Sequence, residues 1–127
     1  MARETVAVLA VDDHEAFRTA VRSVVAATPG FELVGEAASG EECVAASLRL
    51  APDLVLLDVN MPDVDGLQTS RRLGGCEDPP VVVLVSAEED AASEQEVAGC
   101  GAAAFVEKRD LSPGTLRALW ARHGSPR

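Results

Sequence analysis

The sequence lacks any long apolar segment. No apolar run approaches the roughly 18 residues that a membrane-spanning helix needs, and the first residues are not followed by the apolar core of a signal peptide. We therefore expect a soluble, cytoplasmic protein that does not enter a membrane.

Positive charge is also scarce. The chain carries 21 aspartates and glutamates but only 11 lysines and arginines, which gives a formal net charge of -10. Such a surface repels phosphate backbones and anionic lipids, so direct nucleic acid binding by this chain is not expected. Lys108 is the single lysine. Any chemistry that needs a compact ammonium group must therefore use Lys108 or the N-terminus.

The cysteines are too few and too widely spaced for a disulfide framework or a metal centre. Cys43, Cys76 and Cys100 are odd in number and form no CxxC pair. They suit a reducing cytosol, and we expect them to be small buried or half-buried side chains.

Length and hydrophobic pattern indicate one α/β domain. A chain of 127 residues has room for a single compact domain. Short apolar runs predict five strands, over residues 5–11, 31–38, 54–57, 81–85 and 103–106. Longer amphipathic stretches predict five helices, over residues 14–28, 39–51, 67–73, 88–99 and from 112 onward. This alternation predicts a (βα)5 doubly wound fold, in which helices cover both faces of a parallel sheet.

Polar residues follow four of the predicted strands at their carboxyl ends. Asp12 and Asp13 follow the first strand, Asp58 the third, Ser86 the fourth and Lys108 the fifth. The carboxyl ends of parallel strands meet at the edge where such folds place their functional crevice. We therefore expect these side chains to lie together.

Three clustered aspartates require a cation. Two carboxylates about 4 Å apart repel each other by about 4 kcal/mol at an effective dielectric constant near 20. Lys108 can offset one charge, and Mg²⁺, which is held by carboxylates, waters and a phosphate, can offset the rest. A central aspartate beside both cations can act as a nucleophile and form an acyl phosphate. Ser86 would then donate a hydrogen bond to a phosphoryl oxygen.

These residues lie in four segments whose order and spacing can be compared with known families. The segments are VDDH at 11–14, PDLVLLDVNMPDVDG at 52–66, VVVLVSA at 81–87 and GAAAFVEK at 101–108. Together they resemble the receiver (phosphoacceptor) domain of two-component response regulators over nearly the whole chain. The resemblance implies a flavodoxin-like strand order 2-1-3-4-5. It also implies a receiver domain over residues 1–123, with a polar tail or the start of a linker at 124–127.

The resemblance implies a role for each residue of the cluster. Asp58 would accept a phosphoryl group from a histidine kinase, and Asp13 and Asp58 would ligate Mg²⁺ directly. Asp12 would act mainly through a bound water, and the backbone carbonyl of Asn60 would complete the metal site. Lys108 would pair with the phosphoryl group.

Three further residues would respond to the modification or modulate it. Ser86 would turn towards the phosphoryl group, and Phe105 would move inward as the switch aromatic. This movement would remodel the surface of the fourth helix, fifth strand and fifth helix. Glu88, with Asn60, would affect how fast water or phosphatases reach the phosphoryl group. Without the surrounding motif, a lone aromatic such as Phe105 is more often a core residue.

The chain departs from the family pattern after the lysine and in the last strand. Arg109 stands where proline often follows in a cis peptide, and a cis bond before arginine would cost about 2.5–4 kcal/mol, so we expect a trans loop. Ala104 stands where glycine is common, and Phe105 where tyrosine is common, which removes a hydroxyl. These departures concern the output surface more than the phosphorylation site.

His14 and the acidic run at 88–90 each allow two interpretations. His14 follows the aspartate pair and is a candidate metal ligand. Its position at a helix start, together with the preference of Mg²⁺ for oxygen, favours an exposed or capping role. The acidic run is most simply the solvated start of a helix, where the helix dipole favours negative charge.

The sequence thus predicts a phosphorylation-dependent signalling switch with at most slow autophosphatase activity, not a turnover enzyme. Its partners would be a histidine kinase and an output domain or partner protein, and phosphorylation could promote a homodimer. Two alternatives stay open, a constitutive protein-interaction module with an unused acidic pocket and a Mg²⁺-dependent aspartyl phosphohydrolase. The chain could be a stand-alone receiver or the receiver part of a DNA-binding regulator.

Overall fold

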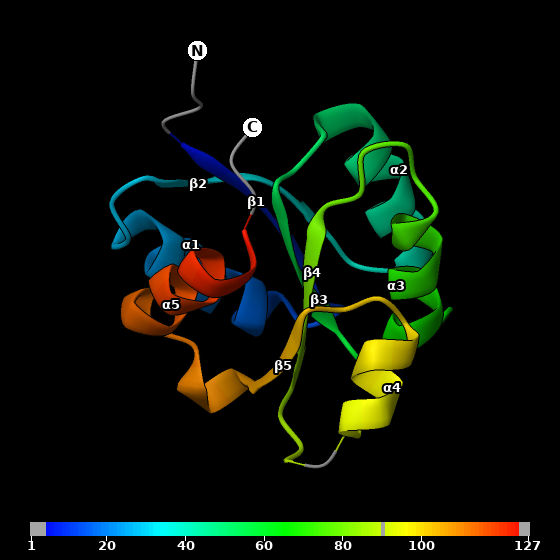
Figure 1. The fold of residues 1–127 in the computed structure, drawn as a ribbon. Helices are drawn as coiled ribbons and strands as arrows, with labels where there is room; N and C mark the ends of the chain where they lie inside the picture. Colours follow the sequence, from blue (N-terminus) through cyan, green and yellow to red (C-terminus); the bar gives the residue numbers. More distant parts are fainter. Residues whose placement is uncertain (1–4, 90, 125–127) are drawn as a thin grey trace.

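The computed structural model describes residues 5–89 and 91–124 and has the expected α/β architecture (Figure 1). Five parallel strands form one sheet in the order β2-β1-β3-β4-β5. They are β1 (Val6–Val11), β2 (Phe31–Ala37), β3 (Leu54–Asp58), β4 (Val81–Ser86) and β5 (Ala104–Glu107). The predicted fold class and strand order are both confirmed.

Helices cover the two faces of the sheet. They are α1 (Glu15–Ala26), α2 (Gly40–Leu50), α3 (Gly66–Gly74), α4 (Glu94–Gly99) and α5 (Pro113–His123), with a short 3-10 turn at Lys108–Asp110. α1 and α5 lie on one face, and α2, α3 and α4 on the other (Figure 1). Within the described ranges, no helix has the length and apolar character needed to cross a membrane.

Each face of the sheet has its own apolar core. In β3, Val55 and Leu57 point into the core shared with α2, α3 and α4, whereas Leu54 and Leu56 point into the core shared with α1 and α5. All four side chains are fully buried. Fully burying one such side chain stabilises a fold by about 1.5–3 kcal/mol. Burial on both faces explains why the central strands are continuous apolar runs.

Helix α4 is shorter than predicted. The sequence pattern indicated a helix over residues 88–99, but α4 begins at Glu94. The Ser93 side chain accepts a hydrogen bond from Glu96 N, and the Glu96 carboxylate accepts one from Ser93 N, which forms a reciprocal capping box. Glu88 and Glu89 lie in the loop before the helix, and residue 90 lies outside the described residues.

The loop between β3 and α3 is held at both of its sides. Asp65 accepts a hydrogen bond from Gln68 N and caps α3. Asp63 reaches across to α2, where it accepts hydrogen bonds from Gly40 N at 3.1 Å and Glu41 N at 3.2 Å. A Cβ at Gly66 would collide with the backbone carbonyl of the last β3 residue. The loop therefore packs directly against the carboxyl end of β3.

A candidate metal centre at the carboxyl edge of the sheet

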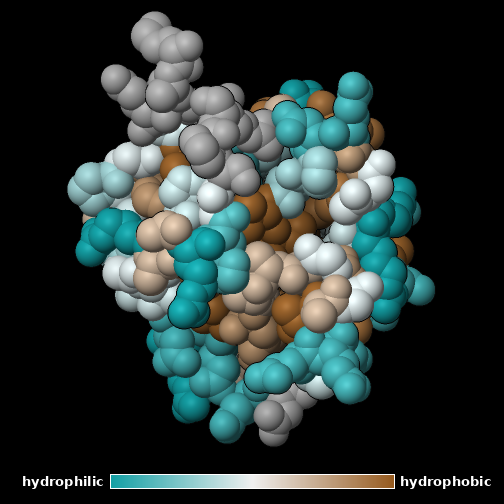
Figure 2. All heavy atoms as spheres, viewed as in Figure 1, coloured by the Kyte–Doolittle hydropathy of each residue, from teal (hydrophilic) through white to brown (hydrophobic). Residues whose placement is uncertain are grey.

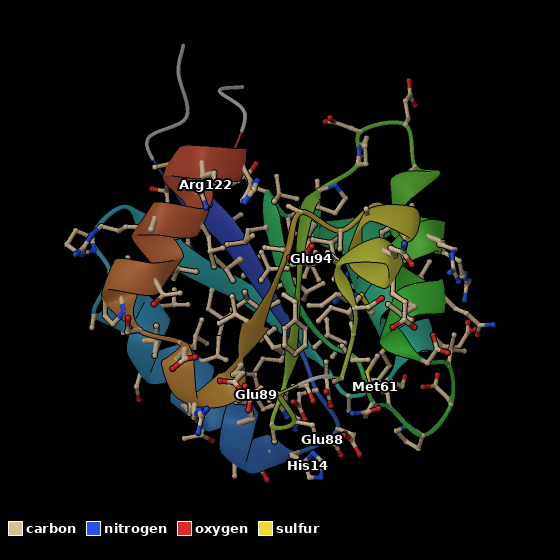
Figure 3. The ribbon with its side chains drawn as sticks, turned by 60° about the horizontal axis from the view of Figure 1, so that its bottom comes forward. His14, Met61, Glu88, Glu89, Glu94 and Arg122 are labelled. Carbon is tan, nitrogen blue, oxygen red and sulfur yellow. The ribbon has the colours of Figure 1, made fainter. Side chains whose placement is uncertain are left out.

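Neighbouring strands place their polar residues at one edge of the sheet. Asp12 follows β1, Asp58 ends β3, Ser86 ends β4, and Lys108 follows β5. The parallel register places Asp58 beside Val85 and Ser86 beside Glu107. Figure 3 shows this edge turned forward, with His14 and Glu88 at its rim. The structure therefore brings together the side chains that the sequence pattern placed at the strand ends.

The acidic residues form a tight cluster. Asp12, Asp13, His14 and Asp58 each offer one ligand atom, and these atoms all lie within 4.8 Å of one another. The Asp12 side chain is 0% exposed, and that of Asp58 is 4% exposed. Asn60 N donates a hydrogen bond to Asp58 Oδ1 at 3.2 Å, which holds the following loop beside the carboxylate. Carboxylate and carbonyl oxygens are the donors that Mg²⁺ prefers, so the residues present fit this ion.

The Lys108 ammonium lies closer to the carboxylate of Asp12 than to that of Asp58. Its Nζ forms an ion pair with Asp12 Oδ2 and lies 3.8 Å from Asp58 Oδ2. The ammonium also lies 4.5 Å from the centroid of the Phe17 ring, a cation–π contact. The sequence pattern places Phe17 within the helix predicted over residues 14–28 and predicts no contact with Lys108. Its position one turn after the aspartates is the one signal that could have revealed this contact.

Asp58 ionises less readily than an ordinary aspartate. Burial raises its pKa from 3.8 to about 6. The negative charge of Asp12 acts in the same direction, whereas the Lys108 ammonium opposes it. Perturbed carboxylates of this kind are concentrated at functional sites.

Two arginines of α1 bind Glu36 of β2, and one of them, Arg18, also braces the loop that carries the aspartates. Arg18 donates a hydrogen bond to the backbone carbonyl of Asp12 at 2.5 Å and another to Glu36 of β2 at 3.2 Å. Arg22 donates to the same Glu36 carboxylate. These hydrogen bonds hold the pKa of Glu36 below its ordinary value. The sequence pattern does not reveal these contacts, because the distance between α1 and β2 is set by packing.

Ser86 and Phe105 lie on the side of the site that leads to α4. The buried Ser86 hydroxyl accepts a hydrogen bond from Glu88 N at 3.0 Å, which fixes the loop after β4. Phe105 is half-buried and lines a groove with Val97 and Ala98 of α4. Figure 2 shows apolar atoms in the middle of this face, between α5 and α4.

The segment after β5 differs locally from the family pattern, as expected. All peptide bonds within the described ranges are trans, including the bond between Lys108 and Arg109. Arg109 forms an ion pair with Glu107 at 3.0 Å on the surface. The predicted trans loop is therefore confirmed, and it begins with the 3-10 turn that sequence analysis did not predict.

Comparison with known proteins agrees with this geometry. The family model described as "Response regulator receiver domain" matches residues 8–119. The response regulator GacA of Pseudomonas aeruginosa is 37% identical over 101 residues, which cover 80% of this chain and 47% of that protein. A protein-glutamate methylesterase/protein-glutamine glutaminase of Alkalilimnicola ehrlichii is 36% identical over 102 residues, which cover 80% of this chain and 26% of that protein. The chain thus spans less than half the length of either relative.

Solved structures show the same fold. The response regulator domain of Thermotoga maritima CheB superposes with a TM-score of 0.81 at 27% identity, and the match covers 92% of this chain and 95% of that one. The receiver domain of a putative response regulator NarL from Mycobacterium tuberculosis superposes with a TM-score of 0.80 at 31% identity, over 91% of this chain and 97% of that one.

Proposed function

The chain belongs to the family of response regulator receiver domains, and from that premise we propose that phosphorylation of Asp58 switches its surface between two states. Receiver domains are in general the phosphorylation switches of two-component systems. The observation that carries the proposal for this chain is the buried Asp58 carboxylate, which faces the only lysine and borders the aspartate pair.

In the proposed reaction, Asp58 is the nucleophile. One of its carboxylate oxygens attacks the phosphorus of a phosphohistidine on the kinase, the P–N bond breaks, and the imidazole leaves with the electron pair and takes up a proton. Positioning and charge neutralisation account for most of the rate of such transfers. Asp13, Asp58 and the Asn60 carbonyl would hold Mg²⁺, with Asp12 acting through a water. When bound, the ion would neutralise charge on the transferred group.

The remaining residues would stabilise the product. Lys108 already lies between Asp12 and Asp58, so its ammonium can reach a phosphoryl oxygen by a small rotation of its side chain. Ser86 accepts a hydrogen bond from Glu88 N, and its own hydroxyl proton is the one it would donate to the phosphoryl group. Turning towards that group would break the contact with Glu88 and release the loop that precedes α4.

The proposed output is a changed surface at α4, β5 and α5. Phe105 lines the groove beside α4, and an inward movement of its ring would reshape that groove. A partner that binds one form of the groove better than the other would then shift the equilibrium between them. We propose that this partner is either an output domain in a longer polypeptide or a separate protein, and that phosphorylation occurs in the cytoplasm. Asn60 and Glu88 flank the site and would tune the lifetime of the phosphoryl group.

Intact-mass measurement tests the phosphorylation site. The protein is incubated with Mg²⁺ and acetyl phosphate, and we expect a gain of one phosphoryl group. The gain should vanish with a metal chelator and in Asp58→Asn. Asp63→Asn is the matched control, because it makes the same chemical change in the following loop, and it should keep the gain. An unchanged gain in Asp58→Asn would refute the assignment of Asp58. No gain in the wild type would favour a constitutive interaction module.

A further inference from the structure

His14 does not act as the helix cap that its position suggests. It occupies the N-cap position of α1, but its side chain makes no capping hydrogen bond. The ring is instead turned back towards the acidic cluster, although the side chain is 70% exposed and could point into water. Its Nδ1 lies within hydrogen-bonding distance of Asp12 Oδ1, at 3.1 Å, and within ion-pair distance of Asp13 Oδ1, at 3.2 Å, so without an ion the ring makes polar contacts with both acids.

These separations match the spacing of neighbouring ligands around one octahedral ion. With metal–ligand bonds of about 2.1 Å, adjacent ligand atoms lie about 3.0 Å apart and opposite ones about 4.2 Å apart. Nδ1 lies at about the adjacent spacing from each of the two carboxylate oxygens, and one ligand atom from each of the four residues, Asp58 included, lies within 4.8 Å of the others. Small side-chain movements would therefore bring Asp13, His14 and Asp58 into contact with one ion, with Asp12 one water away.

The backbone under His14 is fixed independently of any ion. Asp12 Oδ1 accepts a hydrogen bond from His14 N at 2.7 Å, and Arg18 binds the Asp12 carbonyl. The loop is thus braced from both β1 and α1. A ligand atom on a fixed backbone loses less conformational freedom when it binds, which favours the ion that can use that atom.

An imidazole in this position changes which ion the site prefers. Mg²⁺ is a hard cation that binds oxygen and retains waters, so it gains little from the ring. Imidazole suits first-row transition metals, whose affinity for nitrogen sites rises from Mn²⁺ through Co²⁺ to Ni²⁺. We propose that His14 Nδ1 is a direct metal ligand, and that its ring adds more to the affinity of the pocket for Mn²⁺ and later first-row dications than to its affinity for Mg²⁺. This inference rests on the metal site of the proposed function and adds a nitrogen ligand to it.

Electron spin echo spectroscopy of bound Mn²⁺ tests the nitrogen ligand directly. The sequence holds 2 histidines, so a coordinated imidazole can only be His14 or His123. At pH 8, where free imidazole is neutral, we expect nitrogen modulation of the Mn²⁺ echo in the wild type. His14→Phe should abolish the modulation. His123→Phe is the matched control, since this residue ends α5, and it should leave the modulation intact.

Calorimetric titration of each ion tests the preference. We expect His14→Phe to weaken Mn²⁺ binding by at least about tenfold, the loss that even outer-shell changes cause at metal sites. Mg²⁺ binding should change by less than about twofold, because water replaces the ring around that ion. His14→Leu provides a second substitution at this exposed position, again without a ligand atom, and should reproduce both results.

The outcomes separate this inference from the proposed function. Stoichiometric Mn²⁺ binding without nitrogen modulation would overturn the role of His14 and leave the carboxylate site intact. Modulation that persists in His14→Phe would also overturn it. Failure of the wild type to bind either ion would overturn the metal site itself, and with it the inference.

Discussion

At the scale of single residues, the aspartates of the cluster differ in how their charge is compensated. Lys108 forms its closer ion pair with Asp12, whereas Asp58 is buried beside the charge of Asp12 and meets Lys108 only at 3.8 Å. Asp13 is 30% exposed and retains contact with water. The proposed phosphoacceptor is therefore a carboxylate whose ionised form is disfavoured in the folded protein.

Asp58→Asn should stabilise the folded protein at neutral pH when no divalent ion is present. The folded state holds a proton on Asp58 up to about pH 6, whereas the unfolded chain releases it near 3.8. Wild-type stability therefore falls as the pH rises between these values and is then constant. The full effect would be about 3 kcal/mol, and we expect about 1–2 kcal/mol because water reaches the edge of the sheet.

Urea unfolding monitored through Trp120, a partly buried residue of α5 that packs against the core, measures this difference. The experiment uses a chelator and compares wild type and variant from pH 4 to pH 8. The gap between them should open between pH 4 and 6 and then stay level. A variant that is less stable at pH 8, or a gap that does not change with pH, would contradict the prediction.

Residue identities at the site could be predicted from the sequence, but the contacts between them could not. Each polar side chain follows a strand, so its place at the sheet edge is visible in the pattern of Asp12, Asp58, Ser86 and Lys108. Strand twist and helix packing determine which aspartate lies closer to the Lys108 ammonium and bring that ammonium to the Phe17 ring. Those distances leave no trace in a single sequence. The roles of the site residues stay predictions.

At the scale of elements, α4 is the most weakly anchored helix. It has six residues and no fully buried side chain, and its start is fixed by the Ser93–Glu96 capping box. By contrast, α5 holds the fully buried Leu116 in the core. The described parts of the chain thus place the least anchored helix beside the groove that contains Phe105.

Ser93→Ala should loosen α4 without unfolding the protein. Loss of an N-cap costs about 1 kcal/mol, which would speed local amide exchange roughly fivefold. The affected amides are those of Val97 and Cys100, which donate to Ser93 O and Glu96 O. Hydrogen exchange with mass spectrometry or NMR reports the local effect, and urea unfolding reports the global one.

Ser112→Ala is the matched control, because Ser112 caps the well-anchored α5 by accepting from Thr115 N. This substitution should lower the global free energy of unfolding by about 1 kcal/mol. Ser93→Ala should change it by less than about half of that. Equal global losses in the two variants would show that α4 is an integral part of the cooperative unit.

The strands were easier to predict than the helix ends. Runs such as Val81–Ser86 are apolar and β-branched because both faces of the strand are buried, and this constraint is local to the sequence. Two sequence features could each mark the start of α4, the acidic run at residues 88–89 and the Ser93–Glu96 pair. The run at residues 88–89 indicated an early start, but the reciprocal hydrogen bonds of Ser93 and Glu96 determine it.

At the scale of the whole molecule, the Lys108–Asp12 pair connects strands that are not neighbours. β1 and β5 are separated by β3 and β4, yet residues that follow them form an ion pair across the edge of the sheet. The hydrophobic pattern predicted a parallel sheet, but only the resemblance implied the strand order that makes this contact feasible.

Lys108→Met should destabilise the protein strongly in the absence of divalent ions. It leaves the fully buried Asp12 carboxylate without its cation, and breaking such a pair costs about 3 kcal/mol or more. Saturating Mg²⁺ should recover part of the loss, because the ion also compensates the aspartates. Urea unfolding with and without Mg²⁺ measures both effects.

Arg109→Met is the matched control, since it removes the neighbouring cation from an exposed pair with Glu107. We expect a change in the free energy of unfolding of less than about 0.5 kcal/mol. The prediction fails if the two variants lose similar stability, or if Mg²⁺ stabilises Lys108→Met less than the wild type.

Because the site residues follow or end four different strands, they are synthesised at different times. During synthesis the ribosome makes Lys108 about 50 residues after Asp58, which takes about 3–10 s at ordinary elongation rates. Until β5 emerges and adds to the sheet beside β4, the nascent chain has Asp58 but not the ammonium that lies beside it in the folded protein. Under the proposed mechanism, such a chain accepts no phosphoryl group while it is still being made, because the residue that follows its last strand supplies the ammonium.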